Sequence, residues 1–252
     1  WREGRVKKIK KFIDHILLLF SFEKKYFEKE KMSYEFVGHP LLQNKERSKI
    51  DINQVIGKNK ALISIFAGSR KSEIDVLMPI LLNFIKLMND KYNDMTYVFH
   101  STKKYSELIQ SHINKSDLNN CEIVSDDKIK SHILQKSIFA VAKSGTVSLE
   151  ICNAKIPSII IYKVGFINFL IIKFLVKTKY ANIVNFAADK EIIPELLQSD
   201  CNSSNIFKIV SSYLENPREM SEQVKEVQIV LDKLKISGSS SELTSLSLNK
   251  FL

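Results

Sequence analysis

The sequence is poor in glycine, proline and cysteine, and each shortage excludes a class of protein. Its 252 residues include only 7 Gly and 5 Pro, so the chain is neither collagen-like nor of low complexity. It has 3 Cys and no C-x-x-C pair, which argues against a disulfide framework and a structural zinc site. No histidine stands at a metal-ligand spacing, so no metal site is expected. The cysteine content indicates a reducing, cytoplasmic compartment.

The sequence also lacks an initiator methionine and a secretory signal. It begins Trp1-Arg2-Glu3-Gly4-Arg5, and no apolar run of the signal-peptide type follows. We interpret it as part of a longer protein and expect some functional groups to lie upstream. An apolar content of 44% is nevertheless ample for a buried core.

Positive charge is concentrated near the start of the chain. The net charge is +10, and residues 1–60 hold 15 Lys plus Arg against 8 Asp plus Glu. A basic cluster over residues 2–11 precedes the apolar run 16–20, which favours an anionic membrane surface, although a solvated helix face also explains it. No nucleic-acid partner is expected, because there is no binding motif and aromatic residues do not alternate with the basic ones.

A second apolar segment covers residues 158–179. Four polar or small residues interrupt it: Lys163, Gly165, Asn168 and Lys173. A clean transmembrane helix is therefore excluded. The pattern predicts a strand, a short loop and then a helix with an apolar face. Packing in the protein core explains the apolar residues of the strand. The apolar face of the helix is explained equally well by core packing and by contact with lipid.

From residue 61 onward, short apolar β-like runs alternate with helical patterns. The expected strands cover residues 61–67, 95–100, 121–124, 137–142 and 157–162, and the helices between them cover 73–88, 103–113, 127–134 and 146–153. This alternation predicts an α/β fold with a doubly wound parallel sheet. Ligands of such sheets bind beyond the carboxyl ends of the strands, so the loops after the strands are expected to hold the chemistry.

Three regions are expected along the chain. Residues 1–58 look like the end of a preceding domain, residues 59–200 form the sheet domain, and residues 201–252 form C-terminal helices. The elements expected outside the sheet domain are a helix over 6–20, a strand over 34–37, the turn Gly38-His39-Pro40, a linker over 53–60, helices over 205–214, 217–234 and 242–252, and a flexible connection over 237–241. We interpret His39 as structural or at the domain junction.

Gly68-Ser69-Arg70 follows the first expected strand directly. The small residues let backbone amides approach a ligand, and Ser72 is expected to cap the next helix. Arg70 offers a planar fork for a phosphate or a carboxylate. Such a turn is also a common strand-to-helix connection that binds nothing, and this alternative stays open for the loop by itself.

Ser144-Gly145-Thr146 begins the helix after the fourth expected strand. Free amides and the helix dipole favour a diphosphate at that position. Glu150 lies four residues after Thr146 on the same side of the helix and suits the two hydroxyls of a ribose. A diphosphate beside a ribose indicates a nucleotide, with simple helix capping by Ser144 and Thr146 as the alternative.

These loops and four other segments, in order along the chain, resemble the lipid-A-disaccharide synthase family. The segments are Phe36-Val37-Gly38-His39-Pro40, Gly68-Ser69-Arg70 with Glu73, Ser144-Gly145-Thr146 with Leu149-Glu150, Val176-Lys177-Thr178-Lys179-Tyr180, Asn185, and Pro194-Glu195-Leu196-Leu197-Gln198. The resemblance corresponds to the carboxy-terminal portion of that family. It implies an inverting, metal-independent GT-B type glycosyltransferase of lipid A biosynthesis that needs no cofactor and is peripheral on the cytoplasmic side of the Gram-negative inner membrane.

The resemblance also implies the reaction. The enzyme would transfer 2,3-diacylglucosamine from UDP-2,3-diacylglucosamine to 2,3-diacylglucosamine 1-phosphate, and it would release UDP and a β-1,6-linked disaccharide. The expected donor-site residues are Gly68, Ser69, Arg70, Ser144, Gly145, Thr146, Glu150, Asn185, Glu195 and Gln198.

Individual roles follow from the same resemblance. Residues 144–146 would hold the diphosphate, Glu150 the ribose and the loop after Val124 the uracil. Arg70 would stabilise charge on the departing UDP, the role that a metal fills elsewhere. Asn185 and the segment 195–198 would face the donor sugar.

Three departures from the family pattern limit the assignment. The catalytic carboxylate belongs to the amino-terminal domain, so no general base is assigned here and the chain alone is expected to be an incomplete enzyme. Lys143 stands where a small residue is usual, and Ala67 replaces a usual proline.

The alternative function is a non-catalytic, membrane-associated UDP-sugar-binding fragment from a split gene. An α/β hydrolase is set aside, because Ser144 does not stand in a Gly-x-Ser-x-Gly elbow.

Overall fold

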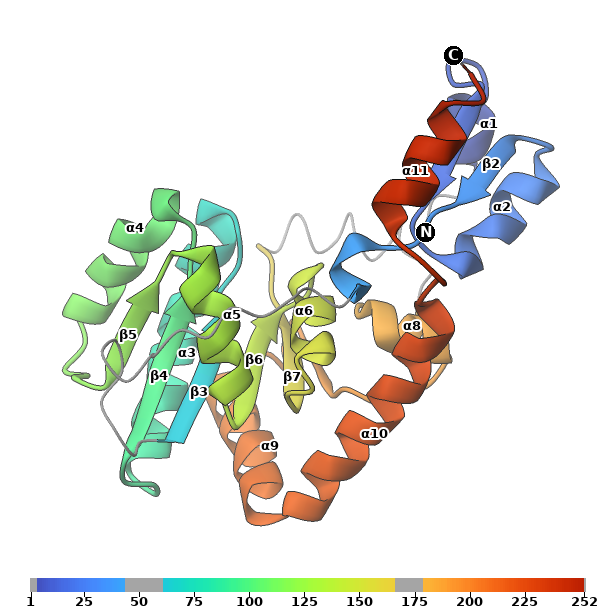
Figure 1. Cartoon of the computed structure of the whole chain (residues 1–252). Helices are drawn as coiled ribbons and strands as arrows, with labels where there is room; N and C mark the ends of the chain where they lie inside the picture. Colours follow the sequence, from blue (N-terminus) through green and yellow to red (C-terminus); the bar gives the residue numbers. More distant parts are fainter. Residues whose placement is uncertain (1–3, 44–60, 166–178, 252) are drawn as a thin grey trace.

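The computed structural model describes residues 4–43, 61–165 and 179–251. In this part of the chain, six parallel strands form one sheet in the order β5-β4-β3-β6-β7-β8 (Figure 1). They are β3 (Ala61–Phe66), β4 (Met95–His100), β5 (Cys121–Val124), β6 (Phe139–Lys143), β7 (Ser158–Tyr162) and β8 (Glu195–Leu197). The order reverses between β3 and β6, which pair directly, so the doubly wound sheet expected from the sequence is confirmed.

Helices cover both faces of this sheet. On one face lie α3 (Lys71–Asn89), α4 (Lys103–Asn114) and α9 (Ser203–Glu215); on the other lie α5 (Asp127–Lys136), α6 (Val147–Asn153), α8 (Ile183–Ala188) and α10 (Pro217–Leu234). Alternate residues of β3 show the division, because Ile63 packs with the first group and Leu62 with the second. Burial on both faces explains why the central strands are mostly apolar on both sides rather than alternating between apolar and polar residues.

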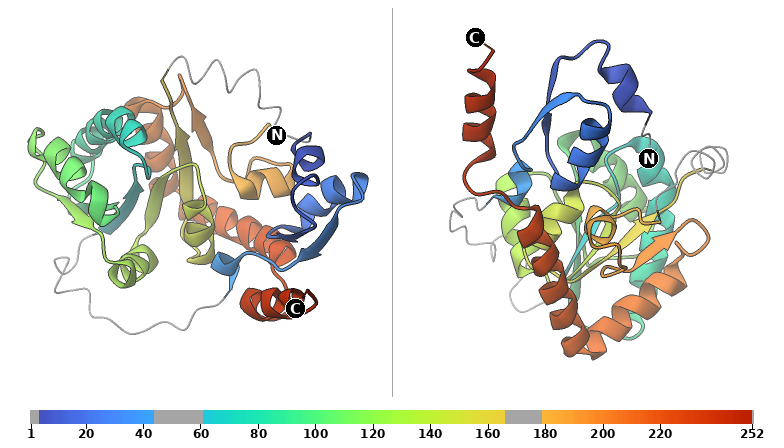
Figure 2. Two further views of the ribbon diagram at one scale, coloured as in Figure 1. Left: turned by 90° about the horizontal axis from the view of Figure 1, so that it is seen from above. Right: turned by 90° about the vertical axis from the view of Figure 1, so that its right-hand side faces the viewer.

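A separate unit is formed by α1 (Arg5–Ile9), β1 (His15–Leu18), α2 (Lys24–Lys29) and β2 (Ser33–Phe36). The two strands are parallel, with His15 opposite Ser33, and they pack around a small core of Val6, Leu18, Phe27 and Met32. The last helix, α11 (Ser240–Leu248), leaves the sheet domain and lies along this unit (Figures 1 and 2). Lys250 Nζ pairs with the Glu35 carboxylate at 3.0 Å, and the rings of His15 and Phe251 are 4.9 Å apart.

Two sequence predictions outside the central sheet need correction, and the sheet itself has one strand more than expected. The helix expected over residues 6–20 is wrong, because α1 ends at Ile9 and the apolar run 16–20 supplies β1, which pairs with β2. The last helix begins at Ser240, so the expected flexible connection is shorter. Strand β8 was not expected. The predicted linker 53–60 and the predicted helix after residue 165 lie outside the described residues.

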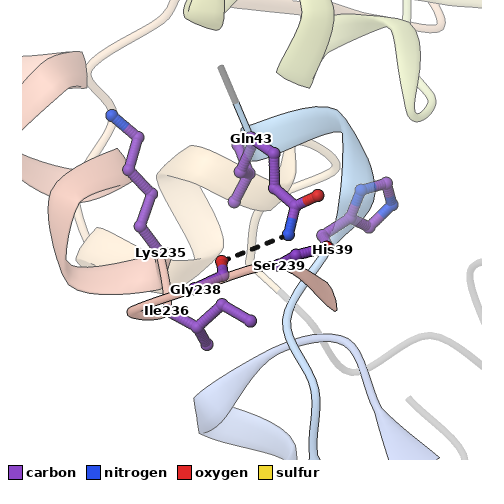
Figure 3. A pocket seen from close by; sticks show the side chains of 7 residues that line it. His39, Gln43, Lys235, Ile236, Gly238 and Ser239 are labelled. Carbon is purple, nitrogen blue, oxygen red and sulfur yellow. Dashed lines mark hydrogen bonds between the residues drawn. The ribbon is translucent and has the colours of Figure 1, made fainter. Parts of the chain in front are cut away.

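The chain crosses between the two units at Gly38 and again just after α10. Gly38 has φ +73°, and a Cβ there would lie 2.8 Å from the Ile236 side chain, so this close crossing requires glycine. Gln43 Nε2 donates to the Gly238 carbonyl oxygen at 3.4 Å (Figure 3). It also donates to Ser240 Oγ at 2.9 Å. A cavity of about 420 Å³ lies at this junction, lined by His39, Leu42, Gln43, Lys235, Ile236, Gly238 and Ser239.

We expect Gln223 to be a major anchor of α10. Its buried amide accepts the Ser158 N–H at 2.7 Å and donates to the Ser158 carbonyl at 3.0 Å. Gln223→Ala should lower the free energy of unfolding by about 1 to 3 kcal/mol in urea titrations, since both backbone groups lose this partner. The exposed Gln110→Ala should stay within about 0.5 kcal/mol of wild type. Equal effects of the two substitutions would contradict this role.

Candidate functional site

The loop between β3 and α3 is folded around the carboxylate of Glu73. Gly68 has φ +120°, and a Cβ there would lie 2.7 Å from Glu73 Oε2. The same oxygen accepts the Ser69 N–H at 3.0 Å. The expected capping by Ser72 is wrong: α3 begins at Lys71 with Arg70 at its N-cap, so Ser72 already lies inside the first turn.

Two cations meet at the other oxygen of this carboxylate. Glu73 Oε1 is 2.9 Å from Lys143 Nζ and 3.2 Å from an Arg70 guanidinium nitrogen. Glu73 and Lys143 are largely buried, with 8% and 17% of their side chains exposed, whereas Arg70 is 74% exposed. Burial acts to raise the pKa of Glu73, but the bonds from Lys143 and Ser69 and the two positive charges outweigh it, so the pKa lies below its ordinary value.

Lys143 joins the loop after β3 to the loops after β6 and β7. It is the last residue of β6, and its Nζ lies 5.4 Å from the centre of the Tyr162 ring at the end of β7. Burial and the nearby Glu73 charge raise the pKa of the Tyr162 hydroxyl. Sequence reasoning treated Lys143 only as a departure from a pattern. One feature of the sequence could have identified Lys143 as a site residue: it is a charged residue at the end of a buried strand, on the edge of the sheet where ligands bind.

The Ser144-Gly145-Thr146 turn follows at once. Ser144 Oγ donates to the Ala181 carbonyl at 2.8 Å, and Thr146, at the N-cap of α6, makes no side-chain capping bond. The Gly145 carbonyl accepts from Ser148 Oγ at 2.8 Å. A Cβ built on Gly145 would meet nothing within 4 Å, so the turn borders open space. Capping by the Ser144 and Thr146 hydroxyls is therefore not what these side chains do.

Asn185 and Glu195 form the next part of the edge. Asn185 is fully buried; its Oδ1 accepts the N–H groups of Ile192 and Ile193, and its Nδ2 donates to Glu195 Oε1 at 2.8 Å. The Glu195 carboxylate also accepts the Ala181 N–H at 2.7 Å. Every polar atom of the Asn185 side chain is thus used inside the protein, which gives it a positioning role. The predicted sugar contact stays a prediction for this segment.

Gln198 completes this edge of the sheet. It has φ +52°, and its N–H donates to the Tyr162 carbonyl at 2.8 Å just beyond the paired ends of β7 and β8. Of the ten predicted residues, seven lie in loops at the carboxyl ends of β3, β6 and β8: residues 68–70, residues 144–146 and Gln198. Glu195 begins β8 and Asn185 lies on α8, and Ala181 links Glu195 to Ser144. Glu150 is exposed, one turn into α6.

A second polar cluster is buried within the sheet domain, between β3, β4 and the start of β6. Ser64 Oγ is 2.8 Å from His100 Nε2 and 2.7 Å from Ser137 Oγ. Burial, with the charge of Lys130, lowers the pKa of His100 to about 3, so the ring is neutral and structural. Within the described part of the chain, no group of three or more His, Cys, Asp or Glu side chains is arranged to hold a metal ion.

Two solved structures with a similar fold contain a uridine nucleotide. The chain superposes on S. aureus MnaA in its UDP co-structure with a TM-score of 0.60, 14% identity and coverage of 92% of this chain and 64% of that one. For Anabaena HepE in complex with UDP-glucose the TM-score is 0.56, the identity 10%, and the coverage 100% and 68%. These likenesses establish the fold class, a GT-B type glycosyltransferase fold.

Sequence comparison gives the family. A family model of lipid-A-disaccharide synthetase matches residues 1–247, and the chain belongs to this family of glycosyltransferases. It is 30% identical over 263 residues to the lipid-A-disaccharide synthase of a Sulfurihydrogenibium species, covering 98% of this chain and 67% of the relative. It is 32% identical over 251 residues to the Rickettsia conorii enzyme, covering 98% and 55%. The chain thus spans between about half and two thirds of the length of these relatives.

Glu73→Gln should make the free energy of unfolding fall less than in the wild type when the pH is lowered from neutral to acid. Because folding lowers the pKa of Glu73, the carboxylate stabilises the fold fully above its ordinary value, about 4.3, and loses this contribution as pH falls through the folded-state pKa. Urea unfolding at pH 7 and at about pH 3 measures the difference between wild type and variant, which should narrow at the lower pH. A difference of the same size at both pH values would contradict the assignment.

Proposed function

We propose that this chain provides the donor side of a lipid-A-disaccharide synthase. The reaction is transfer of 2,3-diacylglucosamine from its UDP derivative to 2,3-diacylglucosamine 1-phosphate, which forms the β-1,6-linked disaccharide and UDP. The observation behind the proposal is that the predicted loops after β3 and β6 lie side by side at the carboxyl ends of these paired strands, joined by the Glu73–Lys143 ion pair, in a member of this family.

The diphosphate lies, in this proposal, in the crevice between β3 and β6. Open space beside Gly145 leaves room for it, and Ser69, Gly145 and Thr146 are exposed toward solvent. Arg70 projects from the facing loop with a largely exposed guanidinium. Its fixed charge stabilises the negative charge that develops on UDP as the sugar leaves, without a metal ion.

The sugar and ribose ends of the donor are assigned to flanking groups. Glu150, exposed on α6, accepts hydrogen bonds from the ribose hydroxyls, in keeping with its place one turn beyond the diphosphate turn. Glu195 and Gln198 face the donor sugar from β8, in a segment that Asn185 holds in place. Inversion at the anomeric carbon requires a base on the acceptor side.

The acceptor side is assigned to the region of residues 1–58. Its described part contains a parallel pair of strands, an arrangement that is seldom stable as an isolated two-stranded sheet. We therefore regard this unit as the end of a larger acceptor domain, with residues 59–200 as the UDP-sugar domain and residues 201–252 as C-terminal helices. The α11 contacts with Glu35 and His15 support a lasting association of both chain ends.

UDP binding tests the donor site. Titration calorimetry should show that the chain binds UDP without Mg²⁺, more tightly than ADP, and that UDP-2,3-diacylglucosamine displaces it. Glu150→Ala should weaken UDP binding by about 1 to 3 kcal/mol, because the hydrogen bonds to the ribose are lost. Glu107→Ala, an exposed change on α4, is the matched control. UDP binding abolished by EDTA, or equal affinity for ADP, would refute the proposed site.

A membrane surface is the partner proposed for the N-terminal unit. None of the described helices is long and apolar enough to cross a bilayer. However, Phe12 is 85% exposed and Ile13 is 42% exposed directly after the basic helix α1. Exposed apolar side chains beside clustered lysines are the two signals that together hold a protein at an anionic interface.

Flotation with vesicles containing phosphatidylglycerol tests this surface. The chain should float with the vesicles at low salt and less at high salt, because the Debye length falls from about 30 Å at 0.01 M to about 3 Å at 1 M. Phe12→Glu should reduce flotation strongly, whereas Ile229→Glu, an equally drastic change at an exposed position of α10, should not. If flotation is unchanged at high salt and is also unchanged in Phe12→Glu, the proposed membrane surface is wrong.

A further inference from the structure

Lys143 occupies the position in the fold where the sheet reverses its order. It ends β6, whose neighbour β3 ends in the Gly68-Ser69-Arg70 loop, so its side chain spans the crevice between the two halves of the sheet. Ligands of open α/β sheets bind in this crevice. The next residue along the chain, Ser144, opens the turn to which the diphosphate is assigned above.

The ammonium group is held in place but retains hydrogen-bonding capacity. Among the described residues, Lys143 Nζ makes one ion pair, with Glu73 Oε1 at 2.9 Å, and it lies against the face of the Tyr162 ring. An ammonium has three donor protons, so one carboxylate oxygen does not exhaust it. With 17% of its side chain exposed, the group is nearly fixed, and little conformational entropy remains to be lost when a ligand binds.

The local charge favours an anion. Arg70 and Lys143 contribute two positive charges, and Glu73 contributes one negative charge between them. Both oxygens of Glu73 are engaged by the loop and by these two cations. The pairing therefore holds Lys143 and the 68–70 loop at a fixed separation and leaves a surplus of positive charge facing the crevice.

We propose that Lys143 binds the diphosphate of the donor directly, while its pairing with Glu73 fixes its position. This inference rests on the proposed function, because the ligand it names is a uridine diphosphate. It adds a residue to the donor site that the sequence pattern treated as an irregularity. A second cation beside Arg70 then shares the charge that develops on the leaving UDP.

The test compares UDP with uridine, since only UDP offers a diphosphate. In titration calorimetry and competition, Lys143→Met should weaken UDP binding about tenfold, equal to about 1.4 kcal/mol, and should leave uridine within about twofold of wild type. Lys136→Met is the control: it removes the same charge in the last turn of α5, at the opposite end of β6. Lys143→Arg should restore part of the UDP affinity.

A double variant separates binding from folding. Glu73→Gln with Lys143→Met removes the pair without stranding a buried charge, and it should show the same selective loss of UDP affinity. Equal losses for UDP and uridine, or no loss for UDP, would overturn the direct contact and leave Lys143 a structural role. If wild type binds no UDP, the proposed function fails, and this inference fails with it; unchanged UDP binding by Lys143→Met overturns this inference alone.

Discussion

Burial of both faces of the parallel sheet is the constraint on which the rest of the structure depends. Once α3, α4 and α9 cover one face and α5, α6 and α10 the other, side chains in the middle of the central strands β3, β4, β6 and β7 are buried, and polar groups of these strands reach solvent at the strand ends. Because the strands are parallel, all their carboxyl ends meet at one edge. Residues far apart in sequence, such as Glu73 and Lys143, are brought within hydrogen-bonding distance there.

The sequence predicted the sheet well, because the strand signal is local. Runs such as Ala61–Phe66 and Ser158–Tyr162 are short, apolar and β-branched, and each is followed by a helical period. The same reasoning failed at residues 6–20, where basic and apolar residues together imitate an amphipathic helix. Only pairing with β2, a contact between distant residues, decides in favour of a strand at His15–Leu18. Strand β8 has three residues and is too short for a periodic pattern.

In the candidate site, too, local features could be predicted from the sequence, whereas contacts between distant segments could not. The loops of residues 68–70 and 144–146 could be predicted because small residues directly after a strand have a recognisable local pattern. The partners that shape them could not: the bond of Ser144 to Ala181 and the enclosure of Asn185 by the 192–195 segment depend on how separate loops meet. Several residues singled out by pattern thus support neighbouring backbone, and the surplus charge comes from a lysine that the pattern did not favour.

The double crossing between the two units has a mechanical consequence. The chain passes from the N-terminal unit to the sheet domain beside Gly38 and returns beside Ile236, where the two segments touch. A unit joined to another by one segment of chain can rotate in any direction. Two adjacent connecting segments oppose twisting of the unit but permit bending about the line that joins them. Bending of the N-terminal unit relative to the sheet domain is therefore the motion that the connectivity favours, and it is opposed by the packing of Phe22 on Phe186.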